Sequence, residues 1–198
     1  MKIYLIRHGE TTGDVEDRYG GDYDDNLSPN GEVQVRGMTK KIIDSDIEVI
    51  YHSPLIRATQ TATIIGEFLK VPLVLVEDLR ERNNYGELTG MTKKEALEQF
   101  PEEVEELEGN PIYHKIPNSE EYFAFAERLI NAFNKIVEGE EDTVAIVTHG
   151  GPIRVIFREL IGFEIEGLAD CAVIEIEKDE EGTEIIGMDG VGSIIPNL

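Results

Sequence analysis

The sequence predicts an α/β fold with a mostly parallel central sheet flanked by helices on both faces, a small helical cap and a C-terminal β-hairpin. Short apolar runs alternate with stretches in which apolar residues recur at helical spacing, an order typical of parallel sheets. The first and fourth runs are apolar throughout, as strands covered on both faces are. The last two runs follow each other closely and have the pattern of an antiparallel pair.

Six apolar runs are predicted to be strands, and helical patterns fall between most of them. They comprise residues 2–6, 47–51, 73–76, 144–147, 172–176 and 184–188. The first four alternate with helices and belong to the parallel part of the sheet, whereas the last two form the hairpin.

Two helices have the same start signal. Ser28-Pro29 and Ser53-Pro54 each combine an N-cap residue with a proline at the first helical position. Proline suits that position because its fixed φ is helical and its missing N–H would find no partner there. After Ser53, apolar residues at helical spacing keep one face of the second helix apolar as far as residue 69.

Three further helices are marked by local signals. Thr92 and Glu95 have the spacing of a capping box, and Pro152 opens a helix that Gly162 ends. From Ser119 onward, apolar residues again recur at helical spacing.

The segment of about residues 87–117 has no clear strand, and we expect it to form the helical cap. The chain of 198 residues has no solenoid repeat and no low-complexity linker, and its 40% apolar fraction suffices for a core. Residues 1–198 are therefore predicted to form a single domain.

The charge of the chain excludes several classes of partner. Forty-one acidic residues against 18 basic residues give a formal charge of −23, which opposes binding to nucleic acid or to an anionic membrane. The N-terminal apolar run is too short for a signal peptide or a membrane span, and the single Cys171 cannot form an intramolecular disulfide. We expect a cytoplasmic protein; homo-oligomerisation is left open.

Two of the four histidines share one context. His8-Gly9 follows the first predicted strand, and His149-Gly150 follows the fourth. Ligands of open α/β sheets bind at the carboxyl ends of the strands, so neighbouring strands would bring these two imidazoles together. Either histidine alone would more simply be a structural residue, but the pair favours a functional site.

Arginines in the same places indicate an anion site. Arg7 directly precedes His8, and Arg57 lies in the first turns of the helix that follows Ser53-Pro54. Guanidinium groups grip tetrahedral oxyanions bidentately and stay charged when desolvated. Arg18, with Gly20 and Gly21, is predicted to add to the rim, because glycine lets backbone amides approach phosphate oxygens.

Glu81 is the candidate proton donor. It follows the third predicted strand and therefore belongs to the same edge of the sheet. A lone glutamate in a loop is usually a solvated residue, so this assignment depends on the histidines and arginines near it.

At this point the sequence resembles the histidine phosphatase (phosphoglycerate mutase-like) superfamily across nearly its whole length. Four blocks in the family's order carry the resemblance. They are Arg7-His8-Gly9-Glu10-Thr11, Ser53-Pro54-Leu55-Ile56-Arg57-Ala58, the Glu81 loop with Tyr85-Gly86, and Thr148-His149-Gly150-Gly151.

The resemblance implies a phosphatase that acts on a small-molecule phosphate ester through a phosphohistidine. His8 would attack phosphorus, Arg7, Arg57 and His149 would hold the phosphoryl oxygens, and Glu81 would protonate the leaving oxygen. The attacking His8 must be neutral, with its other nitrogen donating to a carbonyl, whereas His149 is expected to be protonated. We expect no cofactor and no metal. The predicted substrate-binding residues are Arg7, Asp14, Gly20, Gly21, Arg57, Tyr85 and Gly150.

One departure from the family pattern concerns Asp14, where the family often has asparagine. A carboxylate there would disfavour substrates with a second anionic group close to the reacting phosphate, or it would pair with Arg18.

Three other functions remain open. A 2,3-bisphosphoglycerate-dependent phosphoglycerate mutase would use the same phosphohistidine, and Tyr85 and Lys93 resemble mutase positions. The cap, however, has no arginine and more acidic residues than its three lysines, so it should hold a carboxylated phosphoester poorly. His8, His149 and Glu81 could instead bind a metal ion, although Arg7 and Arg57 would repel it. The last is a non-catalytic phosphate-binding module.

Overall fold

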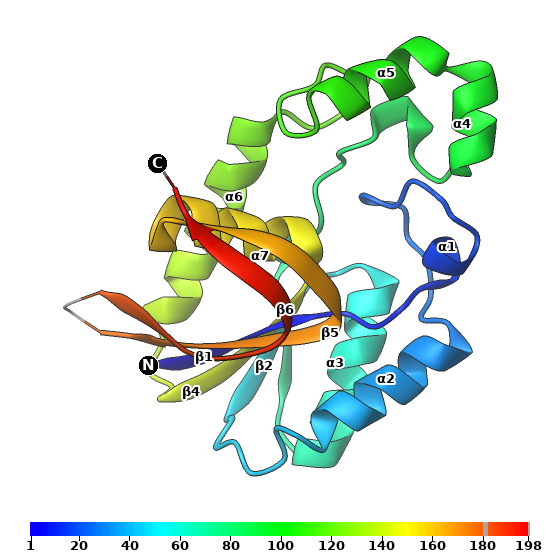
Figure 1. The fold of residues 1–198 in the computed structure, drawn as a ribbon. Coiled ribbons are helices and arrows are strands. Elements are labelled where there is room, and N and C mark those ends of the chain that lie inside the picture. The colour runs from blue at the N-terminus through cyan, green and yellow to red at the C-terminus, as the bar shows by residue number, and fades with distance from the viewer. Residues whose placement is uncertain (180–181, 198) are drawn as a thin grey trace.

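The computed structural model describes residues 1–179 and 182–197, which form a six-stranded sheet with helices on both faces (Figure 1). The strand order is β3-β2-β4-β1-β5-β6. The strands are β1 (Lys2–Arg7), β2 (Val49–His52), β3 (Leu73–Leu75), β4 (Thr143–Thr148), β5 (Phe163–Lys178) and β6 (Thr183–Pro196). The pairs β2–β3, β2–β4 and β4–β1 are parallel, whereas β1–β5 and β5–β6 are antiparallel. The predicted fold class is confirmed.

Two pairs of helices cover the sheet. Helices α2 (Pro29–Thr39) and α3 (Ile56–Leu69) pack on one face against residues such as Ile6 and Val147. Helices α6 (Tyr122–Val137) and α7 (Gly150–Ile156) pack on the other face, against Leu5 and Ile146 among others. Because side chains alternate along β1 and β4, these central strands contribute to both cores.

The cap is a separate helical layer beyond the carboxyl edge of the sheet. It consists of the short 3₁₀ helix η2 (Gly86–Leu88), α4 (Lys93–Gln99) and α5 (Pro101–Gly109); α4 and α5 lie well away from β2 in Figure 1. Its small core contains Leu88, Val104 and Leu107, with Tyr19 from the loop after α1 (Thr12–Val15). Thr92 and Glu95 form the predicted capping box.

Three helices begin at residues other than those predicted. Helix α3 begins at Ile56, three residues after Ser53, and the Ile56 N–H donates to the Asp24 carboxylate at 2.7 Å. Ser53 does not cap the helix: its hydroxyl contacts His149 instead. Helix α6 begins at Tyr122 rather than near Ser119, and α7 begins at Gly150, before Pro152.

The C-terminal hairpin is longer than predicted. Strands β5 and β6 have 16 and 14 residues, and their pairing is interrupted by register shifts, one of them between Leu168 and Val173. The prediction missed α1 and the π-helical turn η3 (Phe157–Ile161) that extends α7 to Gly162. The 3₁₀ helix η1 (Glu77–Leu79) leads from β3 into the Glu81 loop. Within the described residues no helix combines the length and the hydropathy needed to cross a bilayer.

Candidate active site

His8 and His149 meet at the carboxyl edge of the sheet, as predicted. They follow β1 and β4, which are parallel neighbours with Arg7 opposite Thr148. The centroids of the two rings are 5.0 Å apart in an edge-to-face arrangement. Both side chains are buried, so the pair lies at the bottom of the site.

The His8 ring is fixed in one orientation and in one tautomer. Its Nδ1 lies 2.8 Å from the Gly9 carbonyl oxygen, to which it donates, and its Nε2 accepts from the Nε–H of Arg57 at 3.2 Å. Burial, together with the charges of Arg57 and Arg7, lowers the pKa of His8 well below its ordinary value. His8 is therefore neutral with a lone pair on Nε2, which is the state that a nucleophile requires.

Arg57 is positioned by a buried ion pair. It is the second residue of α3, and its Nη1 lies 2.9 Å from the Asp25 carboxylate, with both side chains 5% exposed. It also donates to the carbonyl oxygens of Tyr23 and Gly21. Gly21 thus presents its carbonyl oxygen to Arg57, and contact of the glycine amides with a phosphate stays a prediction.

Arg7 is held from the side of β5. Its guanidinium donates to the Leu168 carbonyl and lies 3.1 Å from the Asp170 carboxylate. The Nε–H of Arg7 is buried and has no partner within the described residues. A buried donor without a partner indicates a ligand contact, since such groups are rarely left unsatisfied.

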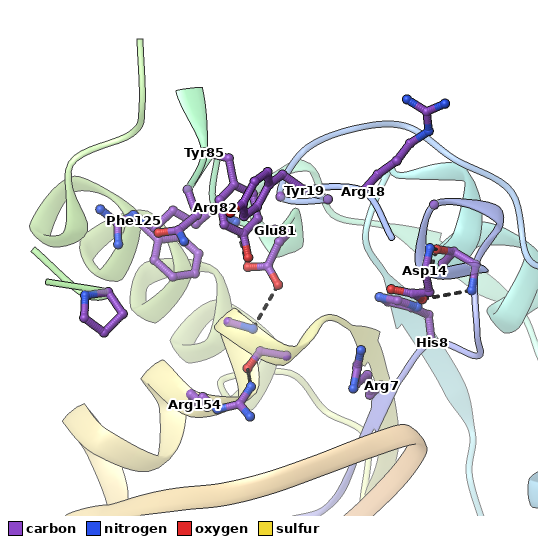
Figure 2. Close-up of a pocket in the computed structure, with 18 of the residues that line it drawn as sticks. Arg7, His8, Asp14, Arg18, Tyr19, Glu81, Arg82, Tyr85, Phe125 and Arg154 are labelled. Carbon is purple, nitrogen blue, oxygen red and sulfur yellow. Dashed lines mark hydrogen bonds between the residues drawn. The ribbon is translucent and has the colours of Figure 1, made fainter. Parts of the chain in front are cut away.

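The Glu81 carboxylate is fixed by two backbone N–H groups. Its Oε1 accepts from Arg82 at 2.8 Å, and its Oε2 accepts from Gly151 at 2.9 Å in the first turn of α7 (Figure 2). A methyl group at Gly151 would lie 2.1 Å from the carboxylate, so glycine leaves the space that Glu81 occupies.

The loop that carries Glu81 is clamped to the sheet and to α6. Arg128 donates to the carbonyl oxygens of Asp78, Arg80 and Glu81, while its charge pairs with Glu120. The Thr148 hydroxyl donates to the Leu79 carbonyl. Nothing in the sequence marked Arg128 as a functional residue, because its partners are backbone atoms far along the chain.

The surroundings of His149 favour the neutral ring rather than the protonated ring expected during phosphoryl transfer. Its Nε2 lies 2.7 Å from the Ser53 hydroxyl, and its Nδ1 is buried without a partner among the described residues. Burial and then the nearby Arg57 lower the pKa of His149 well below its ordinary value. Two neighbouring arginines and complete burial therefore favour the neutral ring, and a protonated His149 stays a prediction for the site with a bound phosphate ester.

A cavity of about 530 Å³ opens above these residues. Its lining includes all the predicted site residues except His149, which lies beneath the surface of the cavity. Seven lining residues are basic and three are acidic, an excess of positive charge in a chain of net charge −23. The basic residues are Arg7, Arg18, Arg57, Arg82, Lys93, Arg154 and Arg158.

Sequence reasoning missed three of these arginines. Arg82 and Arg158 line the wall toward α6, and Arg154 lies on α7. Arg154 follows Gly150 by four residues on the same helix, and this spacing could have placed it at the site.

The predicted rim residues line the cavity but differ in their contacts. Asp14 caps α1 by accepting from the N–H and the hydroxyl of Thr11, and it does not pair with Arg18. Arg18 instead pairs with Glu16 and donates to Gly90. Tyr85 packs against Tyr19, with ring centroids 4.9 Å apart.

The geometry does not favour a metal site. Across residues 1–179 and 182–197, no group of three or more His, Cys, Asp or Glu side chains is arranged to hold a metal ion. His8 and Glu81, two of the three candidate ligands, are held by backbone groups and Arg57, and both guanidinium groups beside His8 carry positive charge.

Comparison with known proteins identifies relatives over almost the whole chain. A model of the histidine phosphatase superfamily (branch 1) matches residues 3–189. The metal-independent phosphoserine phosphatase of Arabidopsis thaliana is 33% identical, over 79% of this chain and 67% of that protein. A 2,3-bisphosphoglycerate-dependent phosphoglycerate mutase of Gloeobacter violaceus is 31% identical, over 91% of this chain and 87% of that protein. The solved structure of Bacillus stearothermophilus YhfR aligns with a TM-score of 0.86 at 27% identity, covering 97% of this chain and 98% of YhfR.

Proposed function

The chain belongs to the histidine phosphatase superfamily, and from that membership we propose that it hydrolyses small-molecule phosphomonoesters through a phosphohistidine on His8. The observation that carries the proposal is the state of His8. Its Nδ1 is bound to a backbone carbonyl, its Nε2 lone pair faces Arg57 and its pKa is lowered, so the ring is a neutral nucleophile beside a cationic pocket.

In the first step, His8 Nε2 attacks phosphorus and the bond from phosphorus to the leaving oxygen breaks. Arg7 and Arg57 neutralise charge on the equatorial oxygens, and Glu81 gives the leaving oxygen a proton. In the second step, water attacks the phosphohistidine, Glu81 takes up its proton, and phosphate leaves with His8 restored. The dianionic phosphoryl group would also offset the effect of the arginines on His149, whose unpartnered Nδ1 would then contact a phosphoryl oxygen.

We also propose that this reaction needs no metal ion. Phosphoryl transfer depends mainly on positioning and on neutralising charge, which guanidinium groups can do in place of a cation. We propose that its partner is a small-molecule phosphate ester. We also propose that residues 1–198 form a single domain and that the protein is cytoplasmic.

The second candidate is a bisphosphoglycerate-dependent mutase, which Tyr85 and the mutase relative favour. A mutase must keep water from the phosphohistidine while a second acceptor binds. The cap contributes to the cavity only Lys93, Pro111 and Ile112 from residues 87–117. Lys93 is paired with Asp17 and its side chain is 56% exposed, so the cap offers little to hold an anionic intermediate.

Two matched histidine variants test the proposal. His8 directly follows β1 and His52 is the last residue of β2; both are 5% exposed and both contact the carbonyl oxygen of the next residue through Nδ1. Asparagine can keep that backbone contact at either position. We expect His8→Asn to abolish phosphate release from a panel of sugar phosphates, phosphoglycerates, phosphoserine and nucleotides, whereas His52→Asn retains it.

The same assay with a chelator tests metal independence. Activity should persist after dialysis against EDTA. A His8→Asn variant that folds and still releases phosphate would refute the proposal, and a loss of activity that added metal restores would refute its metal-free form.

A further inference from the structure

The Glu81 loop (residues 81–85) is also joined to the segment that leads from the cap back to α6. This return segment comprises residues 110–121, between α5 and α6. Three consecutive residues of the loop bind it through side chains or backbone. Arg82 donates to the carbonyl oxygens of Ile112 and Glu120, Asn83 exchanges hydrogen bonds with Asn118 and Glu120, and Asn84 contacts His114. The position of the proton donor therefore depends on the return segment as well as on α6 and the sheet.

Of these contacts, the one between Asn84 and His114 joins two side chains. The Asn84 Oδ1 lies 2.9 Å from His114 Nε2, and because this oxygen can only accept, the ring nitrogen donates. The His114 residue is 3% exposed, and its Nδ1 is buried without a partner among the described residues. Burial and then the charge of Arg82 lower the pKa of His114, which agrees with a neutral ring that carries its proton on Nε2.

Packing alone does not account for a histidine at this position. An imidazole nitrogen that is buried without a partner is unfavourable, whereas an apolar side chain of similar size would fill the same space without that cost. What His114 supplies, and an apolar residue cannot, is the N–H that Asn84 accepts.

Asn84 connects this contact to the proton donor through two backbone groups. The Asn84 N–H donates to the Arg82 carbonyl oxygen at 2.7 Å, and the Arg82 N–H donates to Glu81 Oε1 at 2.8 Å. Asn84 and Glu81 both line the cavity, whereas the lining found within the described part of the chain does not include His114. An effect of His114 on the site would therefore pass through the Glu81 loop.

We propose that His114 is a positioning residue, which holds Asn84 and thereby keeps the Glu81 carboxylate where it can protonate the leaving oxygen. The inference rests on the proposed phosphatase function and adds to it a residue outside the cavity. A general acid must lie within hydrogen-bond reach of the leaving oxygen, and a displacement of about 1 Å can lower the rate by roughly a hundredfold. His114 thus affects the step that Glu81 performs and leaves the nucleophile His8 as it is.

Two substitutions of His114 that differ in reach test the proposal. In glutamine the amide nitrogen takes the place of Nε2 and can still donate to Asn84, whereas in asparagine it takes the place of Nδ1 and falls short. We expect His114→Asn to lower kcat/KM for alkyl phosphates by roughly ten- to a hundredfold. The loss should be much smaller for an activated aryl phosphate, whose leaving group needs no proton. His114→Gln should keep most of the parent's rate on both kinds of ester.

A double variant tests whether His114 acts through Glu81. Glu81→Gln removes the proton donor, so the addition of His114→Asn should lower kcat/KM for alkyl phosphates by no more than about twofold further. If the two residues contributed independently, their losses would multiply.

Val104→Ala separates the positioning of Glu81 from a general loosening of the cap. Val104 is buried in the small core of the cap, on α5 and outside the return segment. Its truncation should lower the temperature of unfolding, while the ratio of alkyl to aryl rates stays that of the parent. Thermal unfolding of the His114 variants, measured beside it, shows whether a loss of rate exceeds what an equal loss of stability causes.

The outcomes separate this proposal from the function on which it rests. The role of His114 would be overturned by equal losses on both kinds of ester in His114→Asn, by equal effects of His114→Asn and His114→Gln, or by multiplied losses in the double variant. A change in the alkyl-to-aryl ratio in Val104→Ala as large as that in His114→Asn would also overturn it. Each of these results leaves the phosphohistidine on His8 intact. No phosphate release from any ester, or a His8→Asn variant that is as active as the parent, would overturn both.

Discussion

At the scale of single residues, the chemistry of the site depends on how three neighbours hold the His8 ring. The Gly9 carbonyl fixes the tautomer, Arg57 Nε–H points at the attacking nitrogen, and His149 packs against the ring edge. Burial and the charge of Arg57 favour the neutral ring, because a second proton on Nε2 would face the Arg57 donor, and they outweigh the Gly9 contact, which favours the protonated ring. The same arrangement that makes His8 nucleophilic therefore makes it hard to protonate.

This burial predicts how stability depends on pH. The folded protein does not take up the proton that His8 of the unfolded chain binds near its ordinary pKa of 6.5, so the free energy of unfolding decreases as the pH falls below that value. His8→Asn removes this titration and should reduce the loss by up to about 1.4 kcal/mol per pH unit. Urea unfolding of both proteins between about pH 7 and about pH 5 measures it. Identical pH dependence would contradict the buried, neutral state of His8.

The role of Glu81 is tested by the leaving group. Glu81→Gln should lower the rate by roughly 10²- to 10⁴-fold on alkyl phosphates, whose leaving alkoxide needs a proton, and much less on an activated aryl phosphate. Gly151→Ala, whose methyl group would displace the carboxylate from its N–H partner, should show the same pattern with a smaller loss. Equal losses on both kinds of ester would mean that Glu81 positions the substrate.

The residues identified from the sequence are those next to recognisable strand ends or helix starts. His8, His149, Arg57 and Glu81 could be placed in this way, because the ends of parallel strands meet at one edge. Asp25, Asp170 and Arg128 hold these groups from distant segments, and a single sequence contains no local signal for such contacts.

At the scale of elements, the sequence predicted the start of a helix correctly where the N-capping residue directly precedes the helix. The predicted start was wrong where the capping group comes from a distant part of the chain. Ser28 caps α2 and Thr92 caps α4 through their own side chains. The first turn of α3 is capped by Asp24, about thirty residues earlier in the chain. The Ser53 hydroxyl binds His149 instead, so a residue that looks like a cap serves the site.

The start of α2 packs closely against the loop that follows His8, and a glycine on each side, Gly31 and Gly9, allows the two backbones to approach. A methyl group on Gly31 would lie 2.0 Å from the Glu10 carbonyl oxygen, and one on Gly9 would lie 2.8 Å from the Gly31 carbonyl oxygen. Because the clashing atoms belong to the backbone, the loop after β1 would have to move. The loop that carries the nucleophile and helix α2 therefore form one packed unit.

Two substitutions in α2 test this packing. Gly31→Ala should destabilise the protein by about 1–3 kcal/mol, as overpacking does, and should lower activity by moving the His8 loop. Gly37→Ala, at an exposed position of the same helix with no atom within 4 Å of the new methyl group, should stabilise it by about 0.5–1 kcal/mol. Chemical unfolding measures both. A neutral Gly31→Ala would show that this contact does not constrain the loop.

At the scale of the whole molecule, charge is distributed unevenly. The chain has a net charge of −23, yet its cavity has seven basic lining residues and three acidic ones. The negative surface opposes polyanionic partners, while the local excess of arginine admits a small phosphate ester. Composition could predict the first property but not the second, because the arginines come from separate segments that only the fold brings together.

Whether water or a second acceptor takes the phosphoryl group from His8 depends on which residues the cap contributes to the cavity. Because the cap contributes one ion-paired lysine to the cavity, we expect water to reach the phosphohistidine before a second acceptor. Phosphate should be released from phosphomonoesters without bisphosphoglycerate priming, with little interconversion of 2- and 3-phosphoglycerate. Both products can be followed in one assay. Isomerisation faster than phosphate release by about tenfold or more would replace hydrolysis with the mutase function.

The central claim is that His8 carries the phosphoryl group, and trapping that intermediate tests it most directly. Rapid quenching without acid, using a substrate labelled in its phosphate, should leave label on the protein, and peptide mapping should locate it on His8. The His8→Asn variant should retain no label and no activity. Label on a serine or an aspartate, or no label at any time together with an active His8→Asn variant, would contradict the account.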